Sequence, residues 1–149
     1  MTLEPIVHDL SLRCSPAAAF YAYAARIGDW WHPDYTSNAA TLATVVIEAR
    51  LGGRVFERHR DGHDVEWGRV TLWAPPRVLA YATHLAQPPE TPSEILVMFE
   101  ATADGCSVHF EHGGWTTANV EQRAKFREWP LLLGRFAALA EPDSGNRPI

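Results

Sequence analysis

The sequence predicts an α+β protein in which a twisted antiparallel sheet of about six or seven strands wraps around a long C-terminal helix. Two observations lead to this prediction. Between residues 44 and 112, hydrophobic and polar residues alternate in short segments that are separated by turn-forming glycine, proline and aspartate. On either side of this region, apolar residues recur at helical spacing. Because the turns between consecutive strands are short, the strands are expected to form an antiparallel meander.

A strand and a helix are predicted before the meander. Residues 6–13 alternate between apolar and polar side chains, which is typical of a strand. Ser15 can cap a helix and Pro16 suits its first position, so a helix is expected to follow. Gly28 is expected to end that helix. Residues 30–40 contain two tryptophans and are expected to form a loop with a second short helix or turn, whose aromatic side chains must cover a neighbouring element.

Six strands are predicted in the meander from the period-two pattern. They are Thr44–Arg50, Arg54–Arg60, Glu66–Trp73, Val78–Leu85, Glu94–Ala101 and Ser107–His112. A strongly twisted sheet of this size has one face that must be covered. The last helix is the only predicted element large enough to cover it, and a curved sheet around a helix leaves room for a cavity.

The last element is predicted to be one long helix that Thr116 or Thr117 caps. Pro130 lies inside this segment and is expected to kink the helix, because proline cannot donate a backbone hydrogen bond. Residues 1–140 are predicted to form a single domain, and residues 141–149 are predicted to form a flexible tail. The helix carries an apolar stripe of Phe126, Trp129, Leu133, Phe136 and Ala140.

The composition excludes several classes of protein. The net charge of −5 argues against a nucleic-acid partner, because such proteins usually carry a basic face. No apolar run reaches membrane-spanning length, and the N-terminus lacks the pattern of a signal peptide. Cys14 and Cys106 lie far apart in the sequence and are expected to be reduced thiols, so the sequence indicates a cytoplasmic protein.

No metal site, cofactor or nucleophilic catalyst is predicted. The seven histidines form no compact ligand set with one another or with cysteine. His109 and His112 are three residues apart on a predicted strand, so their side chains are expected to point to opposite faces of the sheet. Neither cysteine has an identifiable base as a partner, and no glycine-rich phosphate loop is present.

An ordered set of short motifs extends over residues 6–139. These motifs are Trp31-His32-Pro33, Gly52-Gly53 before Phe56-Glu57, Trp67-Gly68-Arg69-Val70, Pro75-Pro76-Arg77-Val78-Leu79, Asp104-Gly105-Cys106-Ser107-Val108 and His112-Gly113-Gly114-Trp115. In this order they resemble the START-like superfamily, also called SRPBCC, which has a helix-grip fold. Within it, the chain resembles the branch named after the C-terminal domain of the activator of the heat-shock protein 90 ATPase. Pro130 and Cys106 depart from the pattern of that branch.

The resemblance implies a protein that binds an apolar or amphipathic small molecule between the sheet and the last helix. Two alternatives stay open. One is an enzyme similar to polyketide cyclases and aromatases, which would need a cavity acid or base, and Glu57 is the only candidate. The other is a co-chaperone-like interaction domain that contacts a chaperone or a second copy of itself. The sequence favours binding without catalysis.

Glu57 and His59 are the predicted polar ligand contacts. By period two they share a strand face with Val55, and on an inward face they would anchor a polar group of the ligand. In the opposite register Phe56 faces inward and both polar residues are solvated. The second register is the preferred one.

The other predicted ligand-binding residues are apolar or aromatic. Trp67 is expected on the same strand face as Trp73, where it either lines the cavity or packs in the core near Trp30 and Trp31, the commoner role for tryptophan. Met98 is predicted as adaptable pocket lining. The final helix is expected to form the cavity floor. The full predicted set is Glu57, His59, Trp67, Tyr81, Met98, Phe126, Trp129 and Leu133.

Overall fold

The structure is a computed structural model that describes residues 2–141. The predicted tail at residues 142–149 lies outside these described residues. No helix among residues 2–141 is both long and apolar enough to cross a lipid bilayer. The elements, in chain order, are β1 Ile6–Leu12, α1 Pro16–Ala24, α2 Ile27–Trp30, β2 Leu42–Ile47, β3 Arg54–His59, β4 Asp64–Ala74, β5 Val78–Thr83, β6 Ser93–Thr102, β7 Gly105–Gly113, the 3₁₀ helix η1 Val120–Lys125 and α3 Trp129–Ala140.

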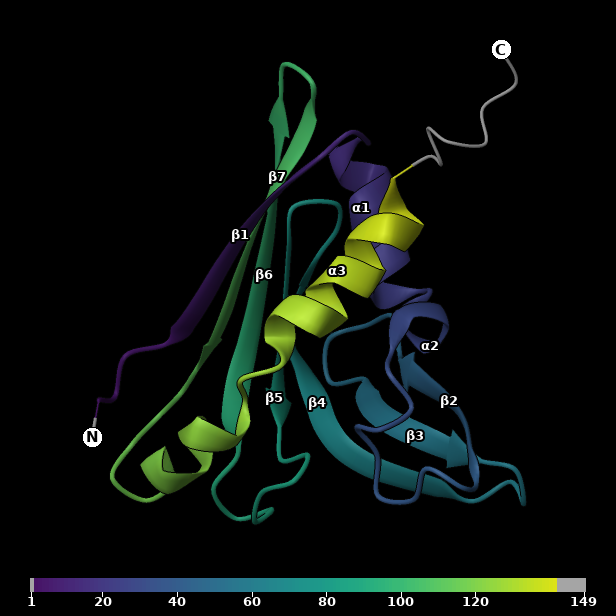
Figure 1. Cartoon of the computed structure of the whole chain (residues 1–149), viewed down its shortest axis with the longest axis vertical. Helices are drawn as coiled ribbons and strands as arrows, with labels where there is room; N and C mark the ends of the chain where they lie inside the picture. The colour runs from purple at the N-terminus through teal and green to yellow at the C-terminus, as the bar shows by residue number, and fades with distance from the viewer. Residues whose placement is uncertain (1, 142–149) are drawn as a thin grey trace.

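The seven strands form one antiparallel sheet in the order β1-β7-β6-β5-β4-β3-β2. Strands β2 to β7 are a meander, and β1 pairs with β7 so that Leu10 lies opposite Val108. The sheet curls into a half-barrel, and α3 crosses its concave face, with α1 and α2 beside it (Figure 1). The predicted α+β helix-grip fold is therefore confirmed.

Two register shifts increase the curvature of the sheet at β4. One lies in the β3–β4 pairing next to Val55, and the other lies in the β4–β5 pairing between Val70 and Leu72. Such bulges add a residue to one strand and bend it. As a result Trp67 and Val70 are both buried although they are three residues apart, and Trp73 packs against the same core.

The segment before α3 differs from the prediction of one long helix. After η1, residues 126–128 break the helix, and α3 begins at Trp129 with Pro130 in its first turn. Proline lacks an amide hydrogen and clashes with a preceding helical turn, whereas the first turn of a helix tolerates both properties. Pro130 therefore begins α3 rather than kinking it, and the break brings Phe126 close to Trp129 at the mouth of the half-barrel.

The start of α1 agrees with the prediction, but its end does not. The hydroxyl of Ser15 accepts a hydrogen bond from the backbone amide of Ala18 at 3.1 Å and caps the helix. The helix ends at Ala24, before Gly28, which lies inside α2. A Cβ atom at position 28 would lie 2.0 Å from the Thr44 hydroxyl, so this glycine allows α2 to pack closely on β2.

Aromatic side chains fill the space between α1, α2, α3 and the sheet. The rings of Tyr23, Trp30 and Phe136 contact one another with centroid distances of 5.0–5.7 Å. The hydroxyl groups of Tyr23 and Tyr81 share a hydrogen bond of 2.8 Å, which joins α1 to β5. The cluster also contacts the loop after α2, because the ring of Trp30 lies 5.7 Å from that of Trp31.

We predict that Gly68→Ala destabilises the protein by about 1–3 kcal/mol, because the new methyl group would lie 2.3 Å from the Ala82 carbonyl oxygen. Gly134→Ala is the matched control. Position 134 is exposed on α3 with no atom within 4 Å of an added Cβ, so this change should stabilise by up to about 1 kcal/mol. Urea unfolding would measure both values, and equal effects would contradict the close strand contact.

Candidate ligand-binding site

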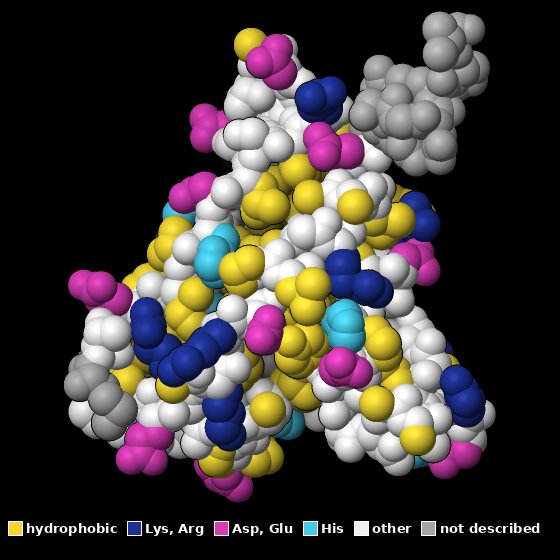
Figure 2. Space-filling model, in the orientation of Figure 1, with side chains coloured by type: hydrophobic (Ala, Val, Ile, Leu, Met, Phe, Trp, Pro, Cys, Tyr) yellow, Lys and Arg dark blue, Asp and Glu magenta, His cyan; other side chains and the backbone are white. Residues whose placement is uncertain are grey.

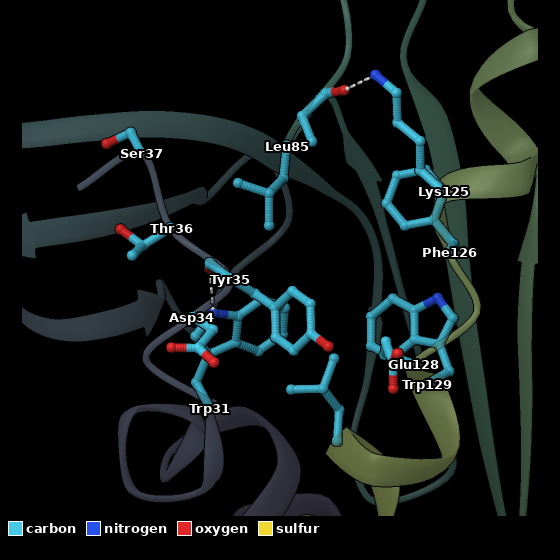
Figure 3. A pocket seen from close by; sticks show the side chains of 12 residues that line it. Trp31, Asp34, Tyr35, Thr36, Ser37, Leu85, Lys125, Phe126, Glu128 and Trp129 are labelled. Atoms are coloured by element: carbon cyan, nitrogen blue, oxygen red, sulfur yellow. Dashed lines mark hydrogen bonds between the residues drawn. The ribbon is translucent and has the colours of Figure 1, made fainter. Parts of the chain in front are cut away.

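A pocket of about 350 Å³ opens at the loop end of the half-barrel. Its walls come from the loop after α2, the β5–β6 loop and the junction between η1 and α3. Trp31 and Tyr35 on one side face Phe126 and Trp129 on the other (Figure 3). Hydrophobic side chains gather below α3 on this face of the molecule, with acidic, basic and histidine side chains at their edge (Figure 2).

The polar groups of the pocket lie around its aromatic walls. Lys125 donates a hydrogen bond from its Nζ atom to the carbonyl oxygen of Ala86 at 2.8 Å. The carboxylates of Asp34 and Glu128 also line the pocket. Burial raises the pKa of the Tyr35 hydroxyl, and these two carboxylates raise it further, so this phenol remains a neutral donor. The pocket is therefore apolar inside, with more acidic than basic groups around it.

A second, smaller cavity of about 20 Å³ lies deeper in the half-barrel. It shares four wall residues with the outer pocket, which are Trp31, Leu85, Phe126 and Trp129. Its remaining walls come from the sheet and are Trp67, Tyr81, Thr83, Ile95 and His112. The outer pocket and the inner cavity are therefore adjacent spaces, separated by shared side chains between the loops and the sheet.

His112 connects the start of α3 to the sheet. Its Nδ1 atom accepts a hydrogen bond from the indole nitrogen of Trp129 at 3.0 Å, and its Nε2 atom lies 2.6 Å from the Ser93 hydroxyl. Burial lowers the pKa of His112 to about 3, and the charge of Arg123 contributes. The ring is therefore neutral, and because Nδ1 accepts, its single proton lies on Nε2 and is donated to Ser93.

Glu57 and His59 are buried on the inner face of β3, so the preferred register was wrong. Each is 1% exposed, and their side chains lie 2.7 Å apart. Phe56 instead faces outward, where the guanidinium groups of Arg54 and Arg58 cover its ring. The predicted solvation of Glu57 and His59 fails because a hydrogen-bonding loop covers this end of the strand.

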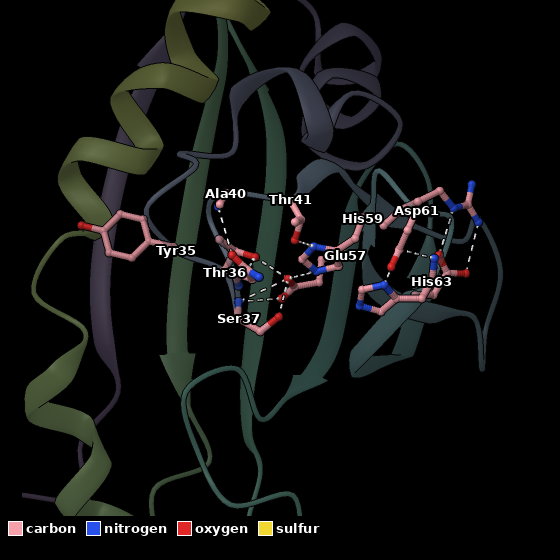
Figure 4. A network of polar contacts seen from close by, with 12 residues as sticks. Tyr35, Thr36, Ser37, Ala40, Thr41, Glu57, His59, Asp61 and His63 are labelled. Atoms are coloured by element: carbon pink, nitrogen blue, oxygen red, sulfur yellow. Dashed lines mark hydrogen bonds and ion pairs between the residues drawn. The ribbon is translucent and has the colours of Figure 1, made fainter.

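That loop carries the polar wall of the pocket, and Glu57 holds it in place (Figure 4). The Glu57 carboxylate accepts hydrogen bonds from the hydroxyl of Thr36 and from both the amide and the hydroxyl of Ser37. Further along the loop, the Thr41 hydroxyl lies 2.8 Å from Nδ1 of His59. Burial alone would raise the pKa of Glu57, but these hydrogen bonds lower it overall, so the group remains a carboxylate.

The sequence profile of the family described as Activator of Hsp90 ATPase homolog 1-like protein matches residues 15–141. The chain belongs to this family. The match confirms the resemblance drawn from the ordered tryptophan, glycine and proline motifs. The comparison with curated proteins returns no match.

Solved structures that resemble this family member share its fold. The Mesorhizobium loti protein MLL2253 is 18% identical with a TM-score of 0.67, and the alignment covers 91% of this chain and 95% of that one. The Aha1 dimer from Colwellia psychrerythraea is 18% identical with a TM-score of 0.66, covering 95% and 98%. The anthrahydroquino-gama-pyrone synthase Txn09, complexed with SUM, is 26% identical with a TM-score of 0.59, covering 93% and 99%.

The Aha1-like fold brings together some of the predicted ligand-binding residues. Phe126 and Trp129 line the outer pocket, and with Trp67 and Tyr81 they line the inner cavity. The predicted polar pair lies behind the pocket wall, where it anchors the loop. The sequence analysis did not include five further lining residues in the predicted site. These are Trp31, Tyr35, Leu85, Leu132 and His112.

Two predicted residues lie elsewhere. Met98 is on the outer face of β6 and is 40% exposed, because the register of β6 buries Val97 and Phe99 instead. Leu133 is a buried core residue that does not line the outer pocket, which its neighbour Leu132 lines. The alternating pattern identified one face of β6 but could not tell which face is inside.

Metal and thiol chemistry find little support in residues 2–141. No group of three or more His, Cys, Asp or Glu side chains in this range is arranged to hold a metal ion. Cys14 and Cys106 are buried and free. Burial raises the pKa of Cys14 to about 11 and raises that of Cys106, so neither thiol is an activated nucleophile. As predicted, His109 points away from His112, to the outer face.

We predict that His112 makes stability depend on pH. Below about pH 6.5 the unfolded chain binds a proton at His112 that the folded protein, with a pKa of about 3, does not bind. Stability is therefore lost as pH falls from about 6.5 toward 3, by up to about 1.4 kcal/mol per pH unit. Urea unfolding between these pH values should show a smaller slope for His112→Asn. Ser93→Ala disrupts the same network but keeps the titrating ring, so it should retain the slope.

We predict that Glu57→Gln destabilises the protein by about 2–4 kcal/mol, because the amide group places hydrogen-bond donors against the donors of Thr36 and Ser37. The folded pKa of Glu57 is lowered, so its contribution is present above the unfolded pKa near 4.5 and is lost as pH falls through the folded value. Chemical unfolding at pH 7 tests the magnitude. The exposed Glu121→Gln should change stability by less than about 0.5 kcal/mol, and similar losses for the two variants would refute the anchoring role.

Proposed function

We propose that this chain is a cytoplasmic binding protein that holds an apolar or amphipathic small molecule between the sheet and α3. The observation that carries the proposal is the aromatic-walled pocket between Trp31 and Trp129, of about 350 Å³. Its size falls within the range of about 300–1,000 Å³ that is common for small-molecule sites. Two free buried thiols, Cys14 and Cys106, are consistent with a reducing compartment.

The pocket supports binding by burial of apolar ligand surface. A ligand that removes about 200 Å² of apolar surface from water gains about 5 kcal/mol before the costs of association and ordering. The surrounding polar groups, among them Lys125, Glu128 and the hydroxyl groups of Thr36 and Ser37, would orient the exposed end of the ligand. Glu57, which holds two of these residues, would act on the ligand only through them.

The side chains near the pocket give weaker support to catalysis. Glu57, the one nominated acid or base, already accepts hydrogen bonds from Thr36 and Ser37 and does not line either cavity. Both ring nitrogens of His112 are occupied by hydrogen bonds. The similarity to the synthase Txn09 nevertheless supports a cyclase-like enzyme as a second candidate function. In that case Asp34 and Glu128 would be the acid and base groups nearest the ligand.

Self-association is a further proposal, supported by the similar Aha1 protein, whose solution structure is a dimer. It is compatible with ligand binding, because the pocket is built by residues of one chain. Size-exclusion chromatography with light scattering would distinguish a monomer of 16.6 kDa from a dimer. A monomer at all accessible concentrations would remove this proposal and leave the binding function intact.

We predict that Leu132→Trp weakens binding of the neutral fluorescent probe N-phenyl-1-naphthylamine by about tenfold or more, because the larger ring occupies the pocket. Leu131→Trp is the matched control on the same helix turn, since Leu131 is 47% exposed. A fluorescence titration would measure both variants after thermal unfolding has shown that they are folded. Equal affinities for the two variants, or no binding to the unmodified protein, would overturn the proposed site.

Native mass spectrometry of protein purified from its own host would identify the natural ligand. A bound mass that Leu132→Trp removes and Leu131→Trp keeps would assign that molecule to this pocket. The same mass in both variants would assign it to another surface.

A further inference from the structure

Trp67 differs from the other buried tryptophans in the described part of the chain. The indole N–H groups of the others all donate hydrogen bonds: to carbonyl oxygens from Trp30, Trp31 and Trp115, and to a ring nitrogen from Trp129. The Trp67 ring is 3% exposed, and its Nε1 atom has no hydrogen-bond partner within residues 2–141. A buried donor without a partner costs about 1–3 kcal/mol, so its retention in a core needs an explanation.

The position of Trp67 supplies one. This residue lines the inner cavity, with its ring packed against Trp31 at a centroid distance of 5.4 Å. The cavity, of about 20 Å³, has room for one small polar atom group, about the size of a water molecule. Because the two spaces share four wall residues, a shift of these side chains would let a molecule in the outer pocket place one atom beside the indole.

The side chains around the inner cavity favour a neutral ligand atom over a charged one. Among residues 2–141 no Lys or Arg lines the inner cavity, and His112 is neutral with both ring nitrogens occupied. A carboxylate or phosphate there would be a buried anion without a counter-charge, which is strongly unfavourable. The outer pocket adds Asp34 and Glu128 against one ammonium group, Lys125, and so also disfavours an anion.

The residues between the outer pocket and the inner cavity indicate the shape of the part of the ligand that stays in the outer pocket. The four shared residues present three aromatic rings and one leucine side chain, and Tyr35 adds a fourth ring at the outer pocket. Aromatic walls favour planar apolar ligands, which stack on or pack edge-on against the rings.

We propose that the ligand is a neutral, planar, apolar molecule with a carbonyl-type oxygen, and that this oxygen enters the inner cavity and accepts a hydrogen bond from the indole N–H of Trp67. The inference rests on the proposed binding function and narrows it to a ligand class. Thr83, which lines the same cavity, carries a hydroxyl group and so adds a second neutral hydrogen-bond donor to its wall. Trp67 is thereby assigned as the residue that distinguishes ligands with an inward acceptor from those without one.

The test uses two molecules that differ only in the acceptor, fluorene and 9-fluorenone, each competing with N-phenyl-1-naphthylamine. The measured quantity is the ratio of their affinities, which cancels general changes in the pocket. Trp67→Phe keeps an aromatic ring but removes the donor, so the preference for 9-fluorenone should fall by about threefold to tenfold, the effect of one neutral hydrogen bond. Trp73→Phe, on the same strand but outside the inner cavity, should leave the ratio unchanged.

A second measurement on the unmodified protein covers the case in which Trp67→Phe does not fold. The indole N–H resonance of Trp67 in a ¹H–¹⁵N spectrum should move downfield with 9-fluorenone and not with fluorene. An unchanged resonance would overturn the inference and indicate that a buried water satisfies the donor.

The remaining outcomes separate this inference from the proposed function. An affinity ratio that Trp67→Phe leaves unchanged would overturn the role of Trp67, while the pocket would still bind its ligand. Failure of both compounds to displace a bound probe would overturn the planar ligand class. Failure of the probe itself to bind would remove the binding function and this inference together.

Discussion

The hydrogen bond from Trp129 to His112 determines how the helix meets the sheet at the open end of the half-barrel. Pro130 requires a helix start at this point, and the residue before it is thereby fixed against β7. The neutral imidazole of His112 also hydrogen-bonds to Ser93 on β6, so the start of α3 is connected to both strands. Since Phe126 and Trp129 flank the helix break, this one contact sets the position of an entire wall of the pocket.

The opposite wall depends on a different kind of interaction. The loop after α2 has no regular backbone pairing to the sheet along residues 34–38, and the buried carboxylate of Glu57 supplies its anchor. A charged acceptor can satisfy several donors at once, which a neutral side chain of the same size cannot. The pocket thus lies between two walls that are held differently. Neutral hydrogen bonds through His112 hold the wall at Trp129, and the charged carboxylate of Glu57 holds the loop wall.

The sequence predicted the antiparallel meander and the twisted sheet because hydrophobic alternation and turn residues are local signals. It failed where the answer depended on contacts distant in the chain. The inward face of β3 could not be chosen without knowing that Thr36 and Ser37 would satisfy Glu57. Met98 was placed on the wrong face for the same reason. The effect of Pro130 was predicted as a kink because the sequence does not show that the chain already breaks before it.

The pocket walls come mainly from connecting segments, whereas the aromatic cluster around Tyr23 and Phe136 is built by α1, α2 and α3. Substitutions of exposed pocket residues outside the hydrophobic core, such as Asp34 and Lys125, can therefore change the binding site without disturbing the packing that stabilises the fold. Such a separation would let the residues around the pocket change while the scaffold is kept. The fold is accordingly kept in solved structures that are only 11–26% identical to this chain.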